Sequence, residues 1–222
     1  MSTLIWDAAG QRLYETGVKK GVLYVKDDEG QAYKKGVAWN GLTAVTESPS
    51  GAEATALYAD DIKYLELMST EEFGATIEAY TYPDEFGKCD GSAELVSGIR
   101  IGQQSREMFG LSYITTVGND EMGNDYGEKL HLVYGCKAAP SEKAYATIND
   151  SPEAITFSWE VTTTPVAVTG HKNTSHIEID KNKVGEAKWN AILAVVHGSA
   201  EKEAYLPLPD EILEIVNAVS AE

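Results

Sequence analysis

The spacing of apolar residues between positions 152 and 168 constrains the fold of this chain more than any other feature. That stretch reads PEAITFSWEVTTTPVAV. Its large apolar residues stand at every second position: Ile155, Phe157, Trp159 and Val161. Because successive side chains of a strand point to opposite faces, this spacing predicts a strand with one apolar and one polar face. Pro152 and Pro165 cannot donate a hydrogen bond to a neighbouring strand, so we expect pairing to stop near each of them.

Other stretches predict further strands that cover this apolar face. Short apolar runs or alternations occur at 21–25, 35–48, 62–68, 73–82, 106–117, 129–135, 144–148 and 176–180. Within 35–48, Asn40-Gly41 indicates a bulge or a turn between two short strands. Residues 69–73 begin like a capped helix, but the alternation that follows favours a tight turn into the strand at 73–82.

The connections between these strands are predicted from their composition. Residues 48–55 are rich in serine, proline and glycine and predict a loop. A polar, glycine-rich segment joins 106–117 to 129–135, which predicts a hairpin with a long loop. The run at 144–148 is expected to pair with the strand at 154–161.

Helical periodicity is clearest near the C-terminus. Four residues there follow the i, i+3, i+4, i+7 pattern of an amphipathic helix: Trp189, Ile192, Leu193 and Val196. Pro207 to Asp210 then starts a second helix. We therefore expect a mainly β fold with an N-terminal arm at 1–16, a β domain at 17–180 and a C-terminal helical segment at 181–222 packed on it.

The charge balance excludes some classes of function. Eighteen basic and 35 acidic residues give a formal net charge of −17. Residues 47–94 alone hold 12 acidic and two basic residues. Specific nucleic-acid binding is not expected, because its affinity depends on cations that neutralise phosphates. No apolar run approaches the roughly 20 residues of a membrane span, so no membrane partner is expected.

A search for catalytic or metal-binding groups gives little. The four histidines are expected to stand alone, because no pair has helical metal-ligand spacing and none is near a cysteine: His131, His171, His176 and His197. Cys89 and Cys136 are expected to be buried or idle thiols. Asp84 and Glu85 could form a carboxylate pair in a cleft, but the start of a helix explains them better.

One loop offers oxygen donors in a spacing that departs from a calcium loop. Its residues are Asn119, Asp120, Glu121, Asn124, Asp125 and Glu128. A solvated hairpin tip is the favoured interpretation. We therefore expect no enzyme, no metal and no cofactor. What remains is a set of half-buried strands with edges that are either protected or used for self-association.

Several long segments resemble the major tail proteins, or tail tube proteins, of long non-contractile-tailed phages (siphoviruses). These segments are GVLYV, GVAWNGLTAVTESPSGAEATALYADDIKYLELMSTEEFGATIEAYTYPDEF, IGQQSREMFGLSY, GNDYGEKLHLVYG, AAPSEKAYATINDSPEAITFSWEVTTTPV and LPLPDEIL. The resemblance covers roughly residues 14–216. The leading MSTLIWDAAGQRL departs from it, and the correspondence around Trp189 is weaker.

The resemblance implies a tail-tube β-sandwich closed toward a barrel, with one flanking helix at Pro83 to Cys89. It implies hexameric rings that stack into a tube, with double-stranded DNA passing through unbound during ejection into the host. A ring of six chains would carry about a hundred net negative charges, which disfavours adhesion of DNA to the bore. The implied partners are other copies and the tail terminator, tape-measure and distal tail proteins. The implied location is the virion, after assembly in the bacterial cytoplasm.

Two segments receive roles on this basis. The longest polar insertion, Glu47 to Asp61, is assigned to the contact between stacked rings, with these residues as its candidates: Glu47, Ser50, Glu53, Tyr58, Asp60 and Asp61. The strand from Phe73 to Tyr82 is assigned to the ring or lumen wall, with Thr76, Glu78 and Tyr80 as its candidates. The alternative is a β-sandwich module that binds carbohydrate or protein without forming tubes, which would gather aromatic residues on exposed loops. Trp39 and Trp159 instead lie in strand patterns and are expected in the core.

Overall fold

The computed structural model describes residues 3–26, 33–148 and 150–219, and the chain is mainly β with a few short helices. The strands are β1 (Leu13–Val25), β2 (Val37–Ala38), β3 (Leu42–Glu47), β4 (Ala54–Ala59), β5 (Ile62–Met68), β6 (Gly74–Ala79), β7 (Ala93–Val96), β8 (Ile99–Ile101), β9 (Phe109–Asn119), β10 (Gly123–Ala138), β11 (Phe157–Thr162) and β12 (His176–Asp180). The helices are α1 (Phe86–Cys89), α2 (Lys181–Val184), α3 (Glu186–Val196) and α4 (Pro209–Val219).

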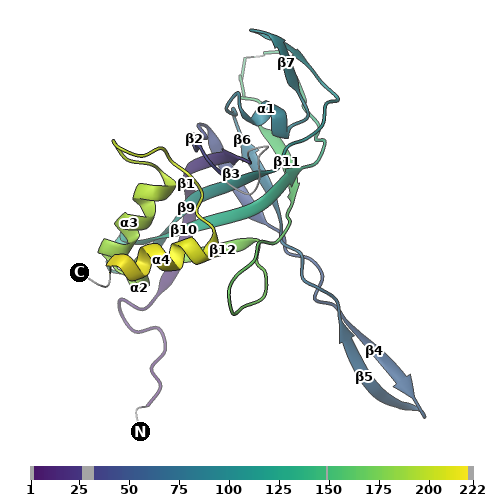
Figure 1. Cartoon of the computed structure of the whole chain (residues 1–222). Helices are drawn as coiled ribbons and strands as arrows, with labels where there is room; N and C mark the ends of the chain where they lie inside the picture. The colour runs from purple at the N-terminus through teal and green to yellow at the C-terminus, as the bar shows by residue number, and fades with distance from the viewer. Residues whose placement is uncertain (1–2, 27–32, 149, 220–222) are drawn as a thin grey trace.

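One large antiparallel sheet curls into a barrel-like body (Figure 1). Its strand order is β2-β1-β9-β10-β11-β6-β3, with β12 added to β10. The ends of this path meet, because β2 pairs with β1 and leads through a short turn into β3, and β1 also lies against β3. The turn falls at Asn40-Gly41, as the sequence predicts.

β10 changes partner halfway along its length. Lys129 to Val133 pair with β12, whereas Lys137 and Ala138 pair with β11. Gly135 lies between the two sets with a φ of 61°. A Cβ atom at this position would lie 2.2 Å from the carbonyl oxygen of Thr164. Only glycine therefore fits this bend, which allows β10 to pair with β12 on one side of Gly135 and with β11 on the other.

The interior of the barrel is filled by aromatic rings. Trp159 of β11 is fully buried, with its ring centroid 5.0 Å from that of Phe86 in α1 and 5.8 Å from that of Trp39. These contacts have the tilted and edge-to-face geometry that aromatic pairs prefer. The predicted strand around Trp159 is confirmed, although it spans only Phe157–Thr162. The predicted core positions of both tryptophans are confirmed as well.

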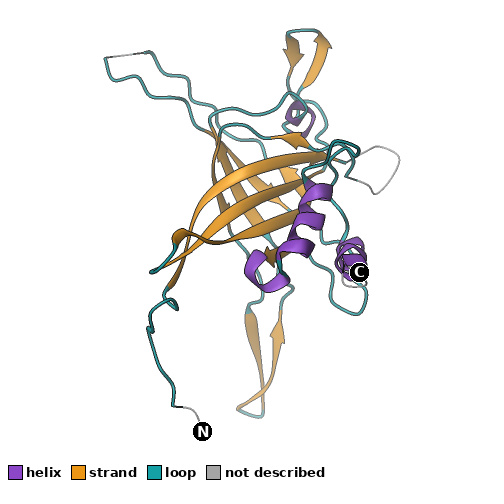
Figure 2. Cartoon of the chain, turned by 90° about the vertical axis from the view of Figure 1, so that its left-hand side faces the viewer, coloured by secondary structure: helices purple, strands orange, loops and turns teal. Residues whose placement is uncertain are grey.

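The C-terminal helices lie against one side of the sheet (Figure 2). A second apolar cluster fills the space between them, outside the barrel. The buried face of α3 consists of Trp189, Ile192 and Val196. It packs in one cluster with Leu130 and Leu132 of β10. Helices α3 and α4 thus cover one outer face of the sheet. No helix in the described ranges is both long and apolar enough to cross a membrane.

Three predicted local structures are wrong. Residues 144–148 form no strand, and β11 pairs instead with β6 along its length and with β10 at Val161 and Thr162. The long loop expected after 106–117 is a tight turn at 120–122, because the side chain of Asn119 accepts hydrogen bonds from the backbone N–H groups of Glu121 and Met122. The polar insertion at 47–61 is not a loop throughout, because β4 begins at Ala54, within the last two residues of the loop predicted at 48–55.

Two further features differ from expectation in extent. β1 starts at Leu13, so it overlaps the segment expected to be an N-terminal arm, residues 1–16, by four residues. Strands β7 and β8 form a small hairpin beyond α1 that no alternation predicted. The predicted strands at 62–68, 73–82, 106–117, 129–135 and 176–180, and the helices at 83–89, 189–196 and from 207, are confirmed within a few residues.

Candidate functional site

The most prominent feature outside the barrel is a two-stranded hairpin that extends away from it (Figure 1). We call β4, β5 and their connection, residues 54–68, the projecting hairpin. It forms a sheet of its own, separate from the barrel. A narrow stem joins it to the body, with Ser50 and Glu72 exchanging backbone hydrogen bonds of 2.8 Å. At the tip, Asp60 and Asp61 have φ values of 50° and 62°, the signature of a type I′ turn.

The projecting hairpin exposes large apolar side chains. They are Leu57, Tyr58, Ile62, Tyr64, Leu65, Leu67 and Met68. Tyr58, Tyr64 and Met68 are each about 70% exposed, at 72%, 69% and 71%. Leu57 and Leu65 lie opposite each other across the two strands. These exposed apolar side chains make the projecting hairpin a candidate surface for contact with another molecule.

The six candidate residues of the stacking contact lie on the projecting hairpin, on its stem and at the end of β3. Tyr58, Asp60 and Asp61 lie at or near the tip of the hairpin. Ser50 belongs to the stem, and the backbone N–H of Glu53 donates to the Ser69 hydroxyl over 3.0 Å. Glu47 ends β3 and is turned toward the barrel. The structure thus places three of the six candidates on the projecting hairpin, two in or beside its stem, and Glu47 at its base.

The candidate wall residues lie on the outer face of the barrel. Ala75, Ile77 and Ala79 of β6 are buried, so the alternate residues Thr76 and Glu78 face outward. Glu160 of the neighbouring β11 lies opposite Thr76. Strands β3, β6 and β11 contain no lysine or arginine. Tyr80 follows β6 and is 55% exposed. This outer face is therefore acidic and is not covered by α3 or α4.

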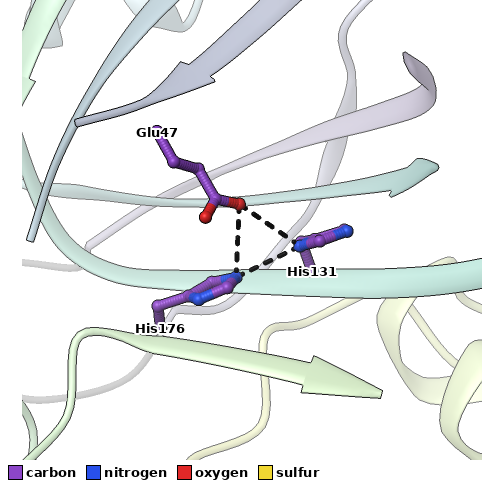
Figure 3. A group of neighbouring side chains, drawn as sticks. All are labelled: Glu47, His131 and His176. Carbon is purple, nitrogen blue, oxygen red and sulfur yellow. Dashed lines mark hydrogen bonds and ion pairs between the residues drawn. The ribbon is translucent and has the colours of Figure 1, made fainter. Parts of the chain in front are cut away.

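The expectation that all four histidines stand alone is wrong for two of them. His131 of β10 and His176 of β12 converge with Glu47 inside one end of the barrel (Figure 3). Nδ1 of His131 lies 3.2 Å from Nε2 of His176. Oε1 of Glu47 lies 3.4 Å from the first nitrogen and 3.6 Å from the second. Strand pairing creates this group, since His176 pairs with the residue two positions beyond His131 on β10.

Hydrogen bonds and burial set the charge states in this group. The pKa of Glu47 is lowered to about 2, first by its hydrogen bond with His131 and further by the Tyr113 hydroxyl, which donates to Oε1 over 2.5 Å. Burial lowers the pKa of His176. Glu47 is therefore a carboxylate and His176 a neutral imidazole at neutral pH.

The remaining candidate groups have ordinary roles. Cys89 and Cys136 are free thiols buried in the barrel core, as predicted, and burial raises the pKa of Cys89 to about 12. In the acidic loop considered for calcium, Asp120 accepts a hydrogen bond of 3.1 Å from the backbone N–H of Gly10. The side-chain amide of Asn119 donates to the carbonyl oxygen of Gly10 over 3.2 Å, so both contacts tie the loop to the N-terminal segment. No sequence spacing signalled the Glu47–His131–His176 group, because its members come from three separate strands.

No family model and no curated protein matches this chain. Among solved structures, the chain is similar to one described as the cryo-EM structure of an extracellular contractile injection system, a PVC sheath-tube complex in the extended state. The two chains are 11% identical, and the match covers 72% of this chain and 88% of the other with a TM-score of 0.31. Because this score is low, we draw no conclusion about this chain from the similarity.

Proposed function

We propose that this chain is a structural tail tube protein of a phage with a long, non-contractile tail, and that it assembles into stacked hexameric rings. Two lines of reasoning support the proposal. The sequence resembles the major tail proteins of such phages over most of its length. The shape and surface of the subunit also suit repeated self-association, with the projecting hairpin as the observation that carries the proposal.

The projecting hairpin suits a contact between rings. Its apolar side chains have no partner surface within its own described chain, and two strands alone bury little apolar area. A ribbon that reaches from one subunit to a different surface on the next makes a heterologous contact, which does not close on itself and generates a filament. The hairpin would thus act as the connector along the tube axis.

The acidic outer face of β3, β6 and β11 suits the wall of the bore. Its position opposite the helix-covered face would leave α3 and α4 on the outside of the tube. Glu78 and Glu160 would then repel the phosphates of DNA over distances limited by the Debye length, about 8 Å at physiological salt. DNA would pass during ejection without binding specifically. The ends of the tube would contact tail terminator, tape-measure and distal tail proteins in the virion.

The proposal assigns the chain no catalytic role and is tested by assembly. We expect the purified chain to form tubes of uniform width in negative-stain micrographs as its concentration is raised. Leu67→Asp, in the projecting hairpin, should abolish the tubes and leave a soluble, β-rich subunit in size-exclusion chromatography. The change places a charge in the apolar contact, where desolvation is costly.

A matched control separates the hairpin from the rest of the surface. Leu213 on α4 is 54% exposed and Leu67 is 55% exposed, so Leu213→Asp makes the same chemical change at equal exposure. Tubes should persist in this control. A wild-type chain that remains a monomer at all concentrations and binds a carbohydrate or a protein ligand would instead support the binding-module alternative. Equal assembly of Leu67→Asp and wild type would refute the role of the hairpin.

A further inference from the structure

We propose that Glu47, His131 and His176 form a binding site for a divalent transition-metal ion, with Zn²⁺ as the ion it fits best. The inference does not depend on tube assembly, because all three ligands belong to one subunit. The group combines two imidazole nitrogens and one carboxylate oxygen, a ligand set that zinc takes in proteins.

The distances between the ligand atoms agree with such a site. The three atoms form a triangle with sides of 3.2, 3.4 and 3.6 Å. A point equidistant from the three corners lies about 2.0 Å from each, which matches the length of Zn–N and Zn–O bonds. An ion displaced slightly from that plane, at about 2.1 Å from each atom, would have Glu47, His131 and His176 at three corners of a tetrahedron.

The surroundings hold the two rings in place. Phe73, His176, His131 and Tyr113 form a continuous stack, in which successive ring planes are inclined by 16°, 10° and 4°. Oγ1 of Thr115 lies 3.0 Å from Nε2 of His131. In the tautomer with its proton on Nε2, His131 donates to this hydroxyl, and Nδ1 can bind an ion in place of the proton that it otherwise donates to Glu47. A hydrogen-bonded far nitrogen of this kind is the usual support of a metal-bound histidine.

The charges of the site also favour a cation. Glu47 brings a carboxylate beside the two imidazole nitrogens, and the ligand atoms of all three residues lie within 4.8 Å of one another. The neighbouring cation Lys129 is neutralised by ion pairs with Glu15 and Glu178. Imidazole ligands favour zinc over calcium and magnesium, which prefer a full shell of oxygen atoms.

Access to the site differs among its three ligands. The side chains of His131 and His176 are 6% and 20% exposed, whereas that of Glu47 is 35% exposed. A metal ion can therefore enter on the Glu47 side, where a water molecule would complete the fourth position.

The location of the site suggests what the ion would stabilise. Glu47 ends β3 immediately before the stem of the projecting hairpin, and Phe73 on the returning side of the stem stacks on His176 with a centroid distance of 4.9 Å. A bound ion would join the base of the hairpin to β10 and β12 and restrict its direction relative to the barrel.

The test is Zn²⁺ binding to the full-length chain without a histidine tag, after treatment with a chelator. Competition against a chromophoric zinc indicator should give one ion per chain with sub-micromolar affinity. Glu47→Gln and His176→Gln should each weaken this affinity by at least about a hundredfold, since each removes one of three ligands. Ca²⁺ and Mg²⁺ at the same concentrations should not compete. Zn²⁺ should also raise the melting temperature of wild type and not of the two variants.

The matched control is His171→Gln, which changes an exposed histidine outside the group and should leave the affinity unchanged. Circular dichroism of metal-free Glu47→Gln and His176→Gln shows whether each variant is folded. The affinity of one folded variant is enough to decide the test. The proposal is overturned if wild type binds no Zn²⁺ at micromolar concentration. It is equally overturned if Glu47→Gln or His176→Gln binds Zn²⁺ as tightly as His171→Gln.

Discussion

The barrel and the projecting hairpin are both built from antiparallel strands, but they keep their apolar residues in opposite environments. In the barrel, the alternation on β11 places Trp159 and Val161 in the core, with 0% and 3% of their surface exposed. In the projecting hairpin, β5 carries Ile62 and Tyr64 at 66% and 69% exposure. The strand-forming pattern is similar in the two regions, so the difference lies in what covers the strands.

This difference indicates where the stability of each region originates. Strands β1, β9, β10, β11 and β6 each have neighbours on both edges and surround a filled interior, so burial of apolar surface stabilises them. The projecting hairpin has two edges without partner strands among the described residues, and such a ribbon is at best marginally stable in water. Its apolar residues are therefore better explained by a partner surface on another copy than by the fold of one subunit.

The largest effect on the stability of the subunit is expected from Trp159→Ala. The substitution removes a fully buried ring that contacts Phe86 and Trp39 and leaves a large cavity. We expect a loss of about 3–5 kcal/mol in the free energy of unfolding. Urea denaturation monitored by far-UV circular dichroism, which reports the backbone and does not depend on tryptophan fluorescence, measures this loss. A loss below about 1 kcal/mol in the free energy of unfolding would show that this aromatic core contributes little to the stability of the barrel.

Gly135→Ala should have the next largest effect, through the backbone rather than the core. Gly135 combines a φ of 61° with a carbonyl oxygen 2.2 Å from the Cβ position, so alanine strains the bend in β10. We expect a destabilisation of about 2 kcal/mol. Gly170→Ala is the matched control, because Gly170 has a φ of 76° with open space around its Cβ position. Equal effects of the two changes would show that the positive φ alone matters.

Tyr113→Phe should have a smaller effect at the junction of the two regions. It removes the hydroxyl that donates to Glu47 and keeps the ring that stacks on His131. We expect the metal-free subunit to lose about 1 kcal/mol, because Glu47 keeps part of its solvation. Chemical denaturation in the presence of a chelator provides the measurement. No loss at all would mean that water replaces this hydrogen bond fully.

Tyr64→Ala in the projecting hairpin should change the stability of the free subunit least, by no more than about 0.5 kcal/mol. The reason is that Tyr64 is 69% exposed and its removal leaves no cavity. The same change should weaken tube formation, measured by light scattering against protein concentration. A large loss of subunit stability would contradict the contrast drawn between the hairpin and the barrel.

The sequence predicted the elements whose periodicity is local. Alternation identified β6, β9 and β11, and the i, i+3, i+4, i+7 pattern identified α3. Residues 144–148 show that such patterns fail elsewhere: the run alternates like a strand, but β11 pairs with β6 and with the end of β10 and not with this run. The extent of β4 was missed for a related reason, because alanine and threonine near Ala54 carry little periodic signal.

The histidine–carboxylate group could not be predicted from spacing. Glu47, His131 and His176 come from β3, β10 and β12, and their proximity follows from the closure of the barrel and the register of β12 on β10. Sequence rules for metal ligands detect pairs within one helix or one turn. The acidic tip of the hairpin was visible in the sequence, but its type I′ geometry at Asp60 and Asp61 required the structure.

Amide hydrogen exchange of the projecting hairpin, compared between the isolated subunit and the assembled protein, tests the central claim most directly. The account predicts fast exchange across residues 54–68 in the subunit and strong protection after assembly, while β9 and β10 are protected in both states. Exchange across 54–68 that is equally fast in both states would contradict the claim that the hairpin connects one copy to the next.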